Sequence, residues 1–273
     1  MKLLFFIFIL FLTVGCRKYL DWEIVDKGRK PVVNAIFITD SVPKIYIYQS
    51  VHILDKPEKN VINQAQVHLI NNQNQFIIPY NNIQQCYKLD SLIIAENTKY
   101  NIKIQTPLGN IENEINTVAK INNIYVDTTL QHNEFEKKVN IKIRFKDDTY
   151  KKNYYIFYVT NNTDIQYISI NDMSIEVING IAFFTDELFN GDYKTIQTSV
   201  YLFGDNYSYS TNFLDIYLIN ADEHSFKYFY STNKQINSKF NPFSEPVMIY
   251  SNIVNGYGII GSYSVSKSTI VVQ

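Results

Sequence analysis

Short hydrophobic runs separated by polar turns follow one another along most of the chain. Residues 44–48 and 100–106 alternate strictly between apolar and polar side chains, which is typical of a strand with one buried face. Turn sequences rich in Asn, Asp, Pro and Gly, such as those at 71–74 and 107–110, separate these runs. Short strands at near-regular spacing predict a sandwich of about seven strands in residues 31–118.

Longer and more aromatic runs follow in residues 119–273. We expect a strand over 139–145, where the alternation is clean, and a buried strand over the aromatic run at 154–159. Further strands are predicted at 175–178, 181–184, 196–203 and 213–219. The second part of the chain is therefore predicted to be a larger β-rich domain.

One segment has the period of a helix. Phe226, Phe229 and Tyr230 recur at helical spacing, and acidic residues precede them where a helix dipole favours negative charge. Asn220 is expected to be the N-cap. The pattern predicts one helix near residues 221–236, with its aromatic side chains facing the core.

The start of the chain has the pattern of an export signal. An unbroken apolar run over residues 3–12 is about half as long as the roughly 20 residues that a spanning helix needs. The following Gly15-Cys16 resembles a bacterial lipoprotein signal, in which Cys16 is acylated and becomes the mature N-terminus. Because two or more acyl chains anchor a protein stably, we expect a signal peptide at 1–15 and a lipid-anchored tether at 16–30.

Composition and charge exclude several classes of protein. The chain has 46% hydrophobic residues, which is enough for a core and excludes disorder as the main state. Its 25 Lys and Arg residues nearly balance 26 Asp and Glu residues and form no long block, so we expect no nucleic-acid partner. The two cysteines, Cys16 and Cys86, cannot form a zinc site by themselves.

The chain lacks the common motifs of catalytic and cofactor sites. No glycine-rich phosphate loop, dinucleotide fingerprint or Gly-x-Ser-x-Gly sequence occurs. Four histidines are scattered without metal-ligand spacing: His52, His68, His132 and His224. We therefore expect no enzyme activity, no metal and no cofactor, although a site assembled from distant residues is invisible in one sequence.

Two acidic segments allow more than one interpretation. Residues 186–192 offer oxygen ligands for calcium, but they lack the order of a helix-loop-helix calcium site, and an Asn-Gly hairpin turn explains them better. Asp147 and Asp148 could act as acid and base, but they lie between two strands with no second carboxylate identifiable nearby. A solvated turn is the favoured interpretation of this pair.

The C-terminal segment at 241–263 resembles the closing motif of a family of Bacteroidota lipoproteins, labelled domain of unknown function 4249. The most specific part of the resemblance is residues 252–258, and weaker similarities extend over nearly the whole mature chain. The resemblance implies an immunoglobulin-like N-terminal sandwich, a larger β-rich C-terminal domain, and an outer-membrane or cell-surface location. Genes of this family often lie beside those of TonB-dependent transporters, and the family supplies no catalytic residue.

Two groups of residues are candidate sites. The first lies in the C-terminal segment and comprises Asn252, Asn255, Gly256, Tyr257 and Gly258. Its glycines allow positive φ and close backbone approach, so the segment could line a binding surface or simply bend the final strand pair. An Asp-Ser/Thr-apolar pattern resembles the O-glycosylation signal of exported Bacteroidota proteins and indicates Ser41, Ser91 and Thr128.

Two functions remain open. The first is a non-catalytic accessory lipoprotein that works with a TonB-dependent outer-membrane transporter, through substrate capture or by capping the barrel. The alternative is a structural or adhesive surface protein without a transporter. The ligand is unknown, and which membrane face carries the protein is undecided.

Aromatic side chains are abundant, and the candidate contact residues are Tyr46, Tyr48, Tyr154, Tyr158, Tyr207 and Tyr209.

Overall fold

The computed structural model describes residues 26, 28–52, 54–56, 60–72, 74–132, 137–149, 151–161, 164–202, 212–239 and 244–272. The predicted signal peptide and Cys16 lie outside these residues. The protein is mainly β, with a single helix in the part of the chain that is described, so the predicted fold class is confirmed. That helix is too short and too polar to cross a bilayer.

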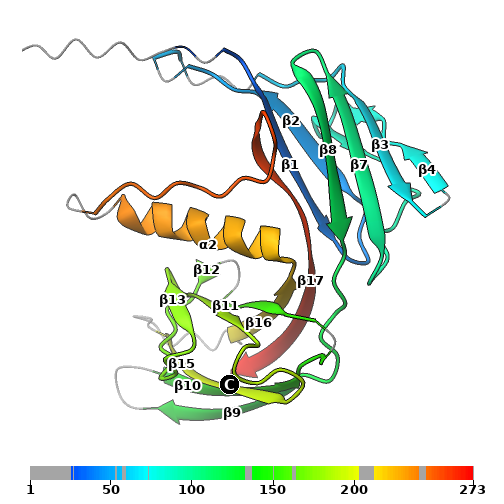
Figure 1. Cartoon of the computed structure of the whole chain (residues 1–273). Coiled ribbons are helices and arrows are strands. Elements are labelled where there is room, and N and C mark those ends of the chain that lie inside the picture. Colours follow the sequence, from blue (N-terminus) through cyan, green and yellow to red (C-terminus); the bar gives the residue numbers. More distant parts are fainter. Residues whose placement is uncertain are drawn as a thin grey trace, which may run out of the picture.

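The N-terminal part is a sandwich of two sheets (Figure 1). Its strands are β1 (Pro31–Ile38), β2 (Lys44–Gln49), β3 (Gln66–Asn71), β4 (Asn74–Ile77), β5 (Tyr80–Asn81), β6 (Cys86–Lys88), β7 (Lys99–Thr106) and β8 (Gly109–Asn116). One sheet has the order β4-β3-β7-β8, and the other continues from β1 through β2 and β6 to β5. Alternate side chains of the two sheets interdigitate in the core, among them Val33, Phe37, Ile47, Leu69 and Ile102.

The C-terminal part has three layers. Its strands are β9 (Tyr125–His132), β10 (Lys137–Lys146), β11 (Tyr154–Asn161), β12 (Asp164–Ile165), β13 (Glu176–Ile178), β14 (Ile181–Thr185), β15 (Tyr193–Leu202), β16 (Asn212–Ala221) and β17 (Tyr257–Val272). The sheet β13-β14-β11-β16-β17 packs on one face against the sheet β15-β10-β9. Helix α2 (Glu223–Ser238) covers the other face (Figure 1).

The long strand β17 belongs to both parts. Residues 257–263 pair in parallel with β1, and residues 263–272 pair antiparallel with β16. Ile260 therefore lies in the core of the N-terminal sandwich, whereas Val272 lies in the C-terminal core. The sheet runs without interruption from one part to the other, because the end of the chain returns to complete the sandwich at its start.

Helix α2 begins at Glu223, two residues later than the predicted N-cap at Asn220 would place its start. The cap is Asp222, whose carboxylate accepts a hydrogen bond from the backbone N–H of Ser225 at 2.7 Å. Asn220 is instead in β16, where its side chain donates to the carbonyl of Ala119. The same Asp222 accepts from the N–H of Ser262 at 2.9 Å, so it joins the start of the helix to β17.

Candidate functional site

The outward face of the sheet β9-β10-β15 presents rows of polar side chains to solvent. Along β10, Ile141 and Ile143 point into the core, so the alternate residues Asn140, Lys142 and Arg144 point to solvent. The antiparallel register sets these side chains in rows across the three strands. No described element packs on this face, because the helix and the second sheet lie on the other side.

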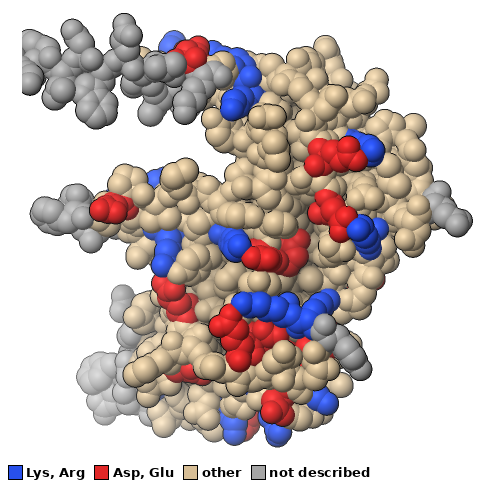
Figure 2. All heavy atoms as spheres, viewed as in Figure 1, with Lys and Arg blue, Asp and Glu red and all other residues tan. Residues whose placement is uncertain are grey.

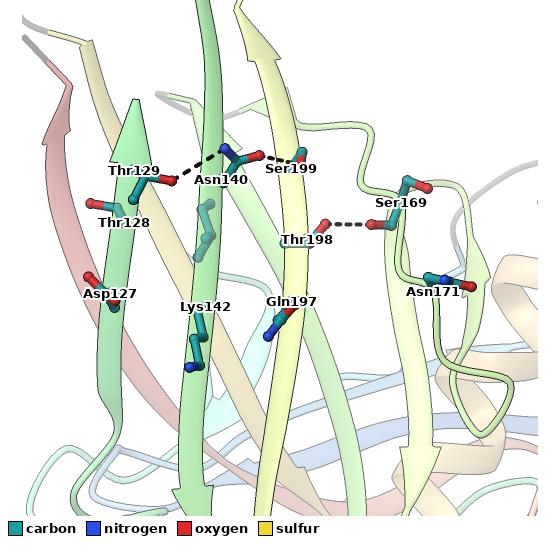
Figure 3. A pocket seen from close by; sticks show the side chains of 11 residues that line it. Asp127, Thr128, Thr129, Asn140, Lys142, Ser169, Asn171, Gln197, Thr198 and Ser199 are labelled. Carbon is teal, nitrogen blue, oxygen red and sulfur yellow. Dashed lines mark hydrogen bonds between the residues drawn. The ribbon is translucent and has the colours of Figure 1, made fainter. Parts of the chain in front are cut away.

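A hydrogen-bonded row crosses the centre of this face. Asn140 lies opposite Thr129 on β9 and Ser199 on β15. Its amide nitrogen donates to the hydroxyl of Thr129 at 3.3 Å, and the hydroxyl of Ser199 donates to its amide oxygen at 2.9 Å (Figure 3). In the next row Lys142 lies opposite Asp127 and Gln197. These side chains therefore present hydroxyl, amide and charged groups on a largely preformed surface.

The segment at 169–171 borders the face beside β15 and makes it concave. The hydroxyl of Thr198 donates to the carbonyl of Ser169 at 3.1 Å, which holds this segment against the strand (Figure 3). The resulting hollow has a volume of about 400 Å³. A second hollow of about 290 Å³ shares Asn171 and Gln197 with it. We call the two together the polar trough.

An ion pair supports the border of the polar trough. The ammonium group of Lys194 lies 2.8 Å from the carboxylate of Asp172 and 3.1 Å from the hydroxyl of Ser174. The hydrogen bond from Lys194, followed by that from Ser174, lowers the pKa of Asp172 to about 2. The carboxylate is therefore ionised at neutral pH and holds the bordering segment to β15.

Exposed tyrosines flank the polar trough at its ends. Tyr193 and Tyr201 lie near the two ends of β15, and their exposed rings are in contact with cations. The guanidinium carbon of Arg144 lies 4.2 Å from the ring centroid of Tyr193, and the ammonium of Lys138 lies 5.5 Å from that of Tyr201. These rings add apolar surface beside hydrogen-bonding groups, which suits a ligand with both polar and apolar faces.

The segment singled out in the sequence lies elsewhere and contacts β1. Asn252 fixes the chain ahead of β17, since its side chain accepts from the N–H of Ile260 at 3.0 Å and donates to the carbonyl of the same residue at 2.6 Å. Gly258 has φ of 103°, and a methyl group there would overlap the carbonyl oxygen of Val33. Asn255 also has positive φ, at 58°.

The close approach to β1 explains the need for glycine in this segment. A methyl group on Gly256 would come within 2.7 Å of the carbonyl oxygen of Pro31. Tyr257 is partly exposed, with the ammonium of Lys30 5.8 Å from its ring centroid. None of the five candidate residues of this segment lines either hollow of the polar trough.

The three predicted glycosylation sites have different surroundings. Thr128 is an exposed residue of β9 and lines the polar trough. Ser91 is exposed in a turn, and Ser41 is half-buried in the turn after β1. Modification of these residues remains a prediction, and intact-mass spectrometry of the exported protein checks it.

The expectation that Asp147 lies in a solvated turn is wrong. This residue is only 4% exposed, and its carboxylate accepts from the hydroxyl of Tyr155, the side-chain amide of Asn153 and the N–H of Gly191. Burial, together with this hydrogen bond, raises the pKa of Tyr155 well above its usual range. The cluster joins the segment 186–192 to the end of β10.

A second buried carboxylate lies in the same region. Asp186 accepts from the N–H of Asn153 at 2.9 Å, so two acidic segments that are distant in the sequence meet around one asparagine. The described part of the chain contains no group of three His, Cys, Asp or Glu residues that could hold a metal ion. The hydrogen bonds of both carboxylates go to the protein itself, which is typical of a structural network.

The tyrosines proposed from the sequence as contact residues are largely packed against protein. Tyr158 stacks on Tyr217 with ring centroids 4.8 Å apart, and Tyr154 lies 5.3 Å from Phe226. Tyr46 and Tyr48 are half-buried in β2. Tyr207 and Tyr209 lie outside the described residues. Sequence reasoning missed the tyrosines of β15, because β9 was not predicted as a strand and the three-stranded face was therefore not expected.

Another hollow, of about 340 Å³, lies between the two parts of the molecule, next to the start of α2. Lys152 in its wall pairs with Glu187, and Asp222 holds the helix to β17 through the hydrogen bonds described above. His224 is hydrogen-bonded to the hydroxyl of Tyr250 at 2.7 Å. These groups are engaged in holding elements together, so we consider the polar trough the better candidate site.

Comparison with known proteins gives one match to a family. A family model described as "Domain of unknown function (DUF4249)" matches residues 17–269. No curated protein matches the chain. Among solved structures, Escherichia coli alpha-2-macroglobulin activated by porcine elastase is 10% identical, with a TM-score of 0.22. That alignment covers 92% of this chain and 22% of the macroglobulin, so the chain spans less than a quarter of that protein.

Proposed function

The chain belongs to the family of domain of unknown function 4249, and from this premise we propose that it is a non-catalytic, lipid-anchored protein of the outer membrane. In this proposal it captures a polar ligand on the polar trough as the accessory of a TonB-dependent transporter. The observation that carries the proposal is the trough itself, a concave and solvent-exposed surface lined by hydroxyl, amide and charged side chains.

The chemistry of the polar trough supports binding more than catalysis. The residues that line its larger hollow include neither histidine nor cysteine, and its single carboxylate, Asp127, lies opposite the ammonium-bearing Lys142. Rows of hydroxyl and amide groups suit a ligand that carries many hydroxyl groups, because each can both donate and accept hydrogen bonds. We therefore expect a hydroxyl-rich ligand.

The position of the polar trough supports capture away from an anchoring surface. In Figure 1, β1 begins at the top of the molecule, and β9, β10 and β15 lie at the bottom. An acylated Cys16 would precede β1 by 15 residues, so the trough would be presented at the end of the molecule far from the bilayer. In this arrangement a ligand could be handed from the trough to a neighbouring transporter.

The surface charge supports a partner other than a polyanion. Figure 2 shows basic and acidic side chains next to one another over the N-terminal sandwich, with no extended basic patch on this view. Two ion pairs join β7 to β8, one between Lys99 and Glu114 and one between Lys103 and Glu112. Mixed charge of this kind gives little attraction for a phosphate backbone.

The partner is tested by affinity purification of the tagged full-length protein from gently solubilised outer membrane, followed by mass spectrometry. We expect a TonB-dependent transporter in near-stoichiometric amount. Recovery of the protein alone would contradict the accessory role and favour the structural or adhesive alternative.

The anchor is tested by Cys16→Ala. Loss of the acyl chains removes the membrane affinity that they provide, so this variant is expected in soluble or secreted fractions. A Cys86→Ala variant is the control, since Cys86 is buried in the N-terminal sandwich and should leave fractionation unchanged. Continued membrane association of Cys16→Ala would contradict the anchor.

The polar trough is tested by binding of the purified protein to a panel of immobilised oligosaccharides. A double substitution of Asn140 and Lys142 by Ala is expected to weaken binding about tenfold or more, because it removes two hydrogen-bonding groups from the centre of the face. The matched control is Lys103→Ala, an exposed lysine of a surface pair on β7. Equal binding by both variants would contradict the assignment of the site.

A further inference from the structure

Strand β9 is an open edge of the C-terminal sandwich. It pairs with β10 on one side and has no described strand on the other. Figure 1 shows it at the bottom of the molecule, beyond β10 and β15. The opposite edge of the same sheet differs, since the hydrogen bond from Thr198 to Ser169 holds a segment against β15.

The sequence of β9 lacks the features that usually prevent an edge from pairing. Its eight residues, YVDTTLQH, contain no proline or lysine and only one residue with a full charge, Asp127. Large side chains are exposed along it, with Tyr125 at 62% and Leu130 at 44% of their full exposure. Backbone groups that face no described strand, together with exposed apolar surface, make β9 suited to pairing with another strand.

We propose that β9 pairs antiparallel with β9 of a second copy of this chain, about a two-fold axis that passes through the middle of the strand. A two-fold axis perpendicular to the sheet keeps each face of the sheet on the same side in both copies. Facing residues must then come from the same face of β9, so the longest allowed overlaps cover seven of its eight residues and are centred on Thr128 or Thr129.

The register centred on Thr128 fits the side chains best. It places Val126 opposite Leu130 twice, on the face that continues the apolar core. On the outward face it places Asp127 opposite Thr129 twice, so a carboxylate meets a hydroxyl in each case. Like charges do not lie directly opposite one another in this register, and each Asp127 also lies opposite Lys142 of its own copy.

A pair of this kind changes the proposed binding surface. The two three-stranded sheets become one six-stranded sheet, and their two polar troughs lie on the same face. The seven residues of β9 that pair in this register span roughly 24 Å, and an edge contact of this size is expected to be weak in dilute solution. The pairing itself does not depend on the ligand or on the lipid anchor.

The pairing is tested by disulfide cross-linking of the full-length protein in membranes under mild oxidation. Thr128→Cys is expected to form a covalent dimer, because directly opposite residues of antiparallel strands have Cα atoms within the range of a disulfide. The control is Thr195→Cys, which places a thiol on the outward face of β15 and away from the proposed axis. This control is expected to remain monomeric.

A second substitution tests the contact that fixes the register. Leu130→Lys added to Thr128→Cys is expected to lower the cross-linked fraction about tenfold, because two contacts between Val126 and Leu130 are lost. Thr195→Lys added to Thr128→Cys should leave that fraction unchanged. Circular dichroism of each variant checks that it is folded.

The outcomes distinguish the possible occupants of the edge. Cross-linking of Thr129→Cys in place of Thr128→Cys would support the pair with its axis at the neighbouring residue. A disulfide to a different protein, or absence of cross-linking from both positions together with a monomeric mass at all concentrations, would overturn the proposal. The intact mass of the wild-type protein is measured in parallel, and a glycan on Thr128 would also overturn the proposal, because it would occupy the axis of the pair.

Discussion

At the scale of single residues, burial decides the role of the acidic side chains. Asp147 and Asp148 are neighbours in the sequence, yet the first is buried and the second is exposed. The Asp147 carboxylate accepts hydrogen bonds from three donors, the Tyr155 hydroxyl, the Asn153 side-chain amide and the backbone N–H of Gly191. The pattern of charges along the chain does not predict which of the two is buried. The burial of Asp147 depends on Tyr155 and Gly191, which come from another strand and another turn.

Asp147→Ala is expected to lower the free energy of unfolding by about 3 kcal/mol, because it leaves the Tyr155 hydroxyl and the Gly191 backbone N–H without the carboxylate that accepts their hydrogen bonds. Urea titration followed by circular dichroism measures this change. The exposed Asp164 serves as the control, and Asp164→Ala should change stability by less than about 0.5 kcal/mol. Equal stability of the two variants would show that the network around Asp147 contributes little.

The ion pair of Asp172 and Lys194 predicts a dependence of stability on pH. The pKa of Asp172 is about 2 in the folded protein, below its ordinary value, so ionisation of this group favours the folded state. The contribution is complete above the pKa of the unfolded chain, near 4, and is lost as the pH falls towards 2. The melting temperature of wild type should therefore exceed that of Asp172→Asn at pH 6, and the difference should shrink between pH 4 and pH 2. A constant difference over this range would contradict the assignment.

At the scale of elements, β17 determines how the two parts of the molecule are joined. Its first residues pair with β1, and this close approach requires glycine at position 258. Gly258 has a positive φ, and a side chain there would overlap the backbone of Val33. The side chain of Asn252 fixes the preceding turn through two hydrogen bonds to Ile260. The segment with the most specific family resemblance therefore has an evident packing role.

Gly258→Ala is expected to lower the free energy of unfolding by about 3 kcal/mol or more, from the combined effect of positive φ and overlap with Val33. Gly109→Ala is a matched control, because Gly109 also has positive φ, at 131°, but open space around it. The difference between the two variants in urea titration isolates the steric part. A similar loss for both would mean that backbone strain alone explains the effect.

At the scale of the whole molecule, the shared strand couples the two cores. Ile260 in the N-terminal core and Val272 in the C-terminal core belong to one continuous strand. Separation of the two parts would break the parallel pairing of β1 with β17 and expose apolar surface of the sandwich. We therefore expect the two parts to unfold together.

Scanning calorimetry is expected to show one unfolding transition. Ile102→Ala, in the N-terminal core, should lower the temperature of that whole transition, because it removes a fully buried side chain at a loss of about 2–5 kcal/mol. Ile77→Ala is the control, since Ile77 is mostly exposed. Two separate transitions, of which Ile102→Ala shifts only one, would contradict the coupling.

Local periodicity determined much of the fold. The two-residue alternation of 44–48, 100–106 and 139–145 and the helical spacing of Phe226 and Phe229 identified elements that the structure contains, because both patterns arise from contact with one apolar core. Strand β9 was missed, since its inner face is only partly covered and its sequence has little apolar alternation.

Tertiary structure alone decided the pairing of the strands and the place of the candidate site. The parallel contact of β1 with β17 joins residues more than 200 positions apart, and the polar trough requires the register of three strands together with the bordering segment at 169–171. Periodicity reports which face of an element is buried but not which partner buries it. The sequence by itself thus determined the β-rich class, the single helix and the family resemblance, whereas long-range packing decided which polar side chains meet on one surface.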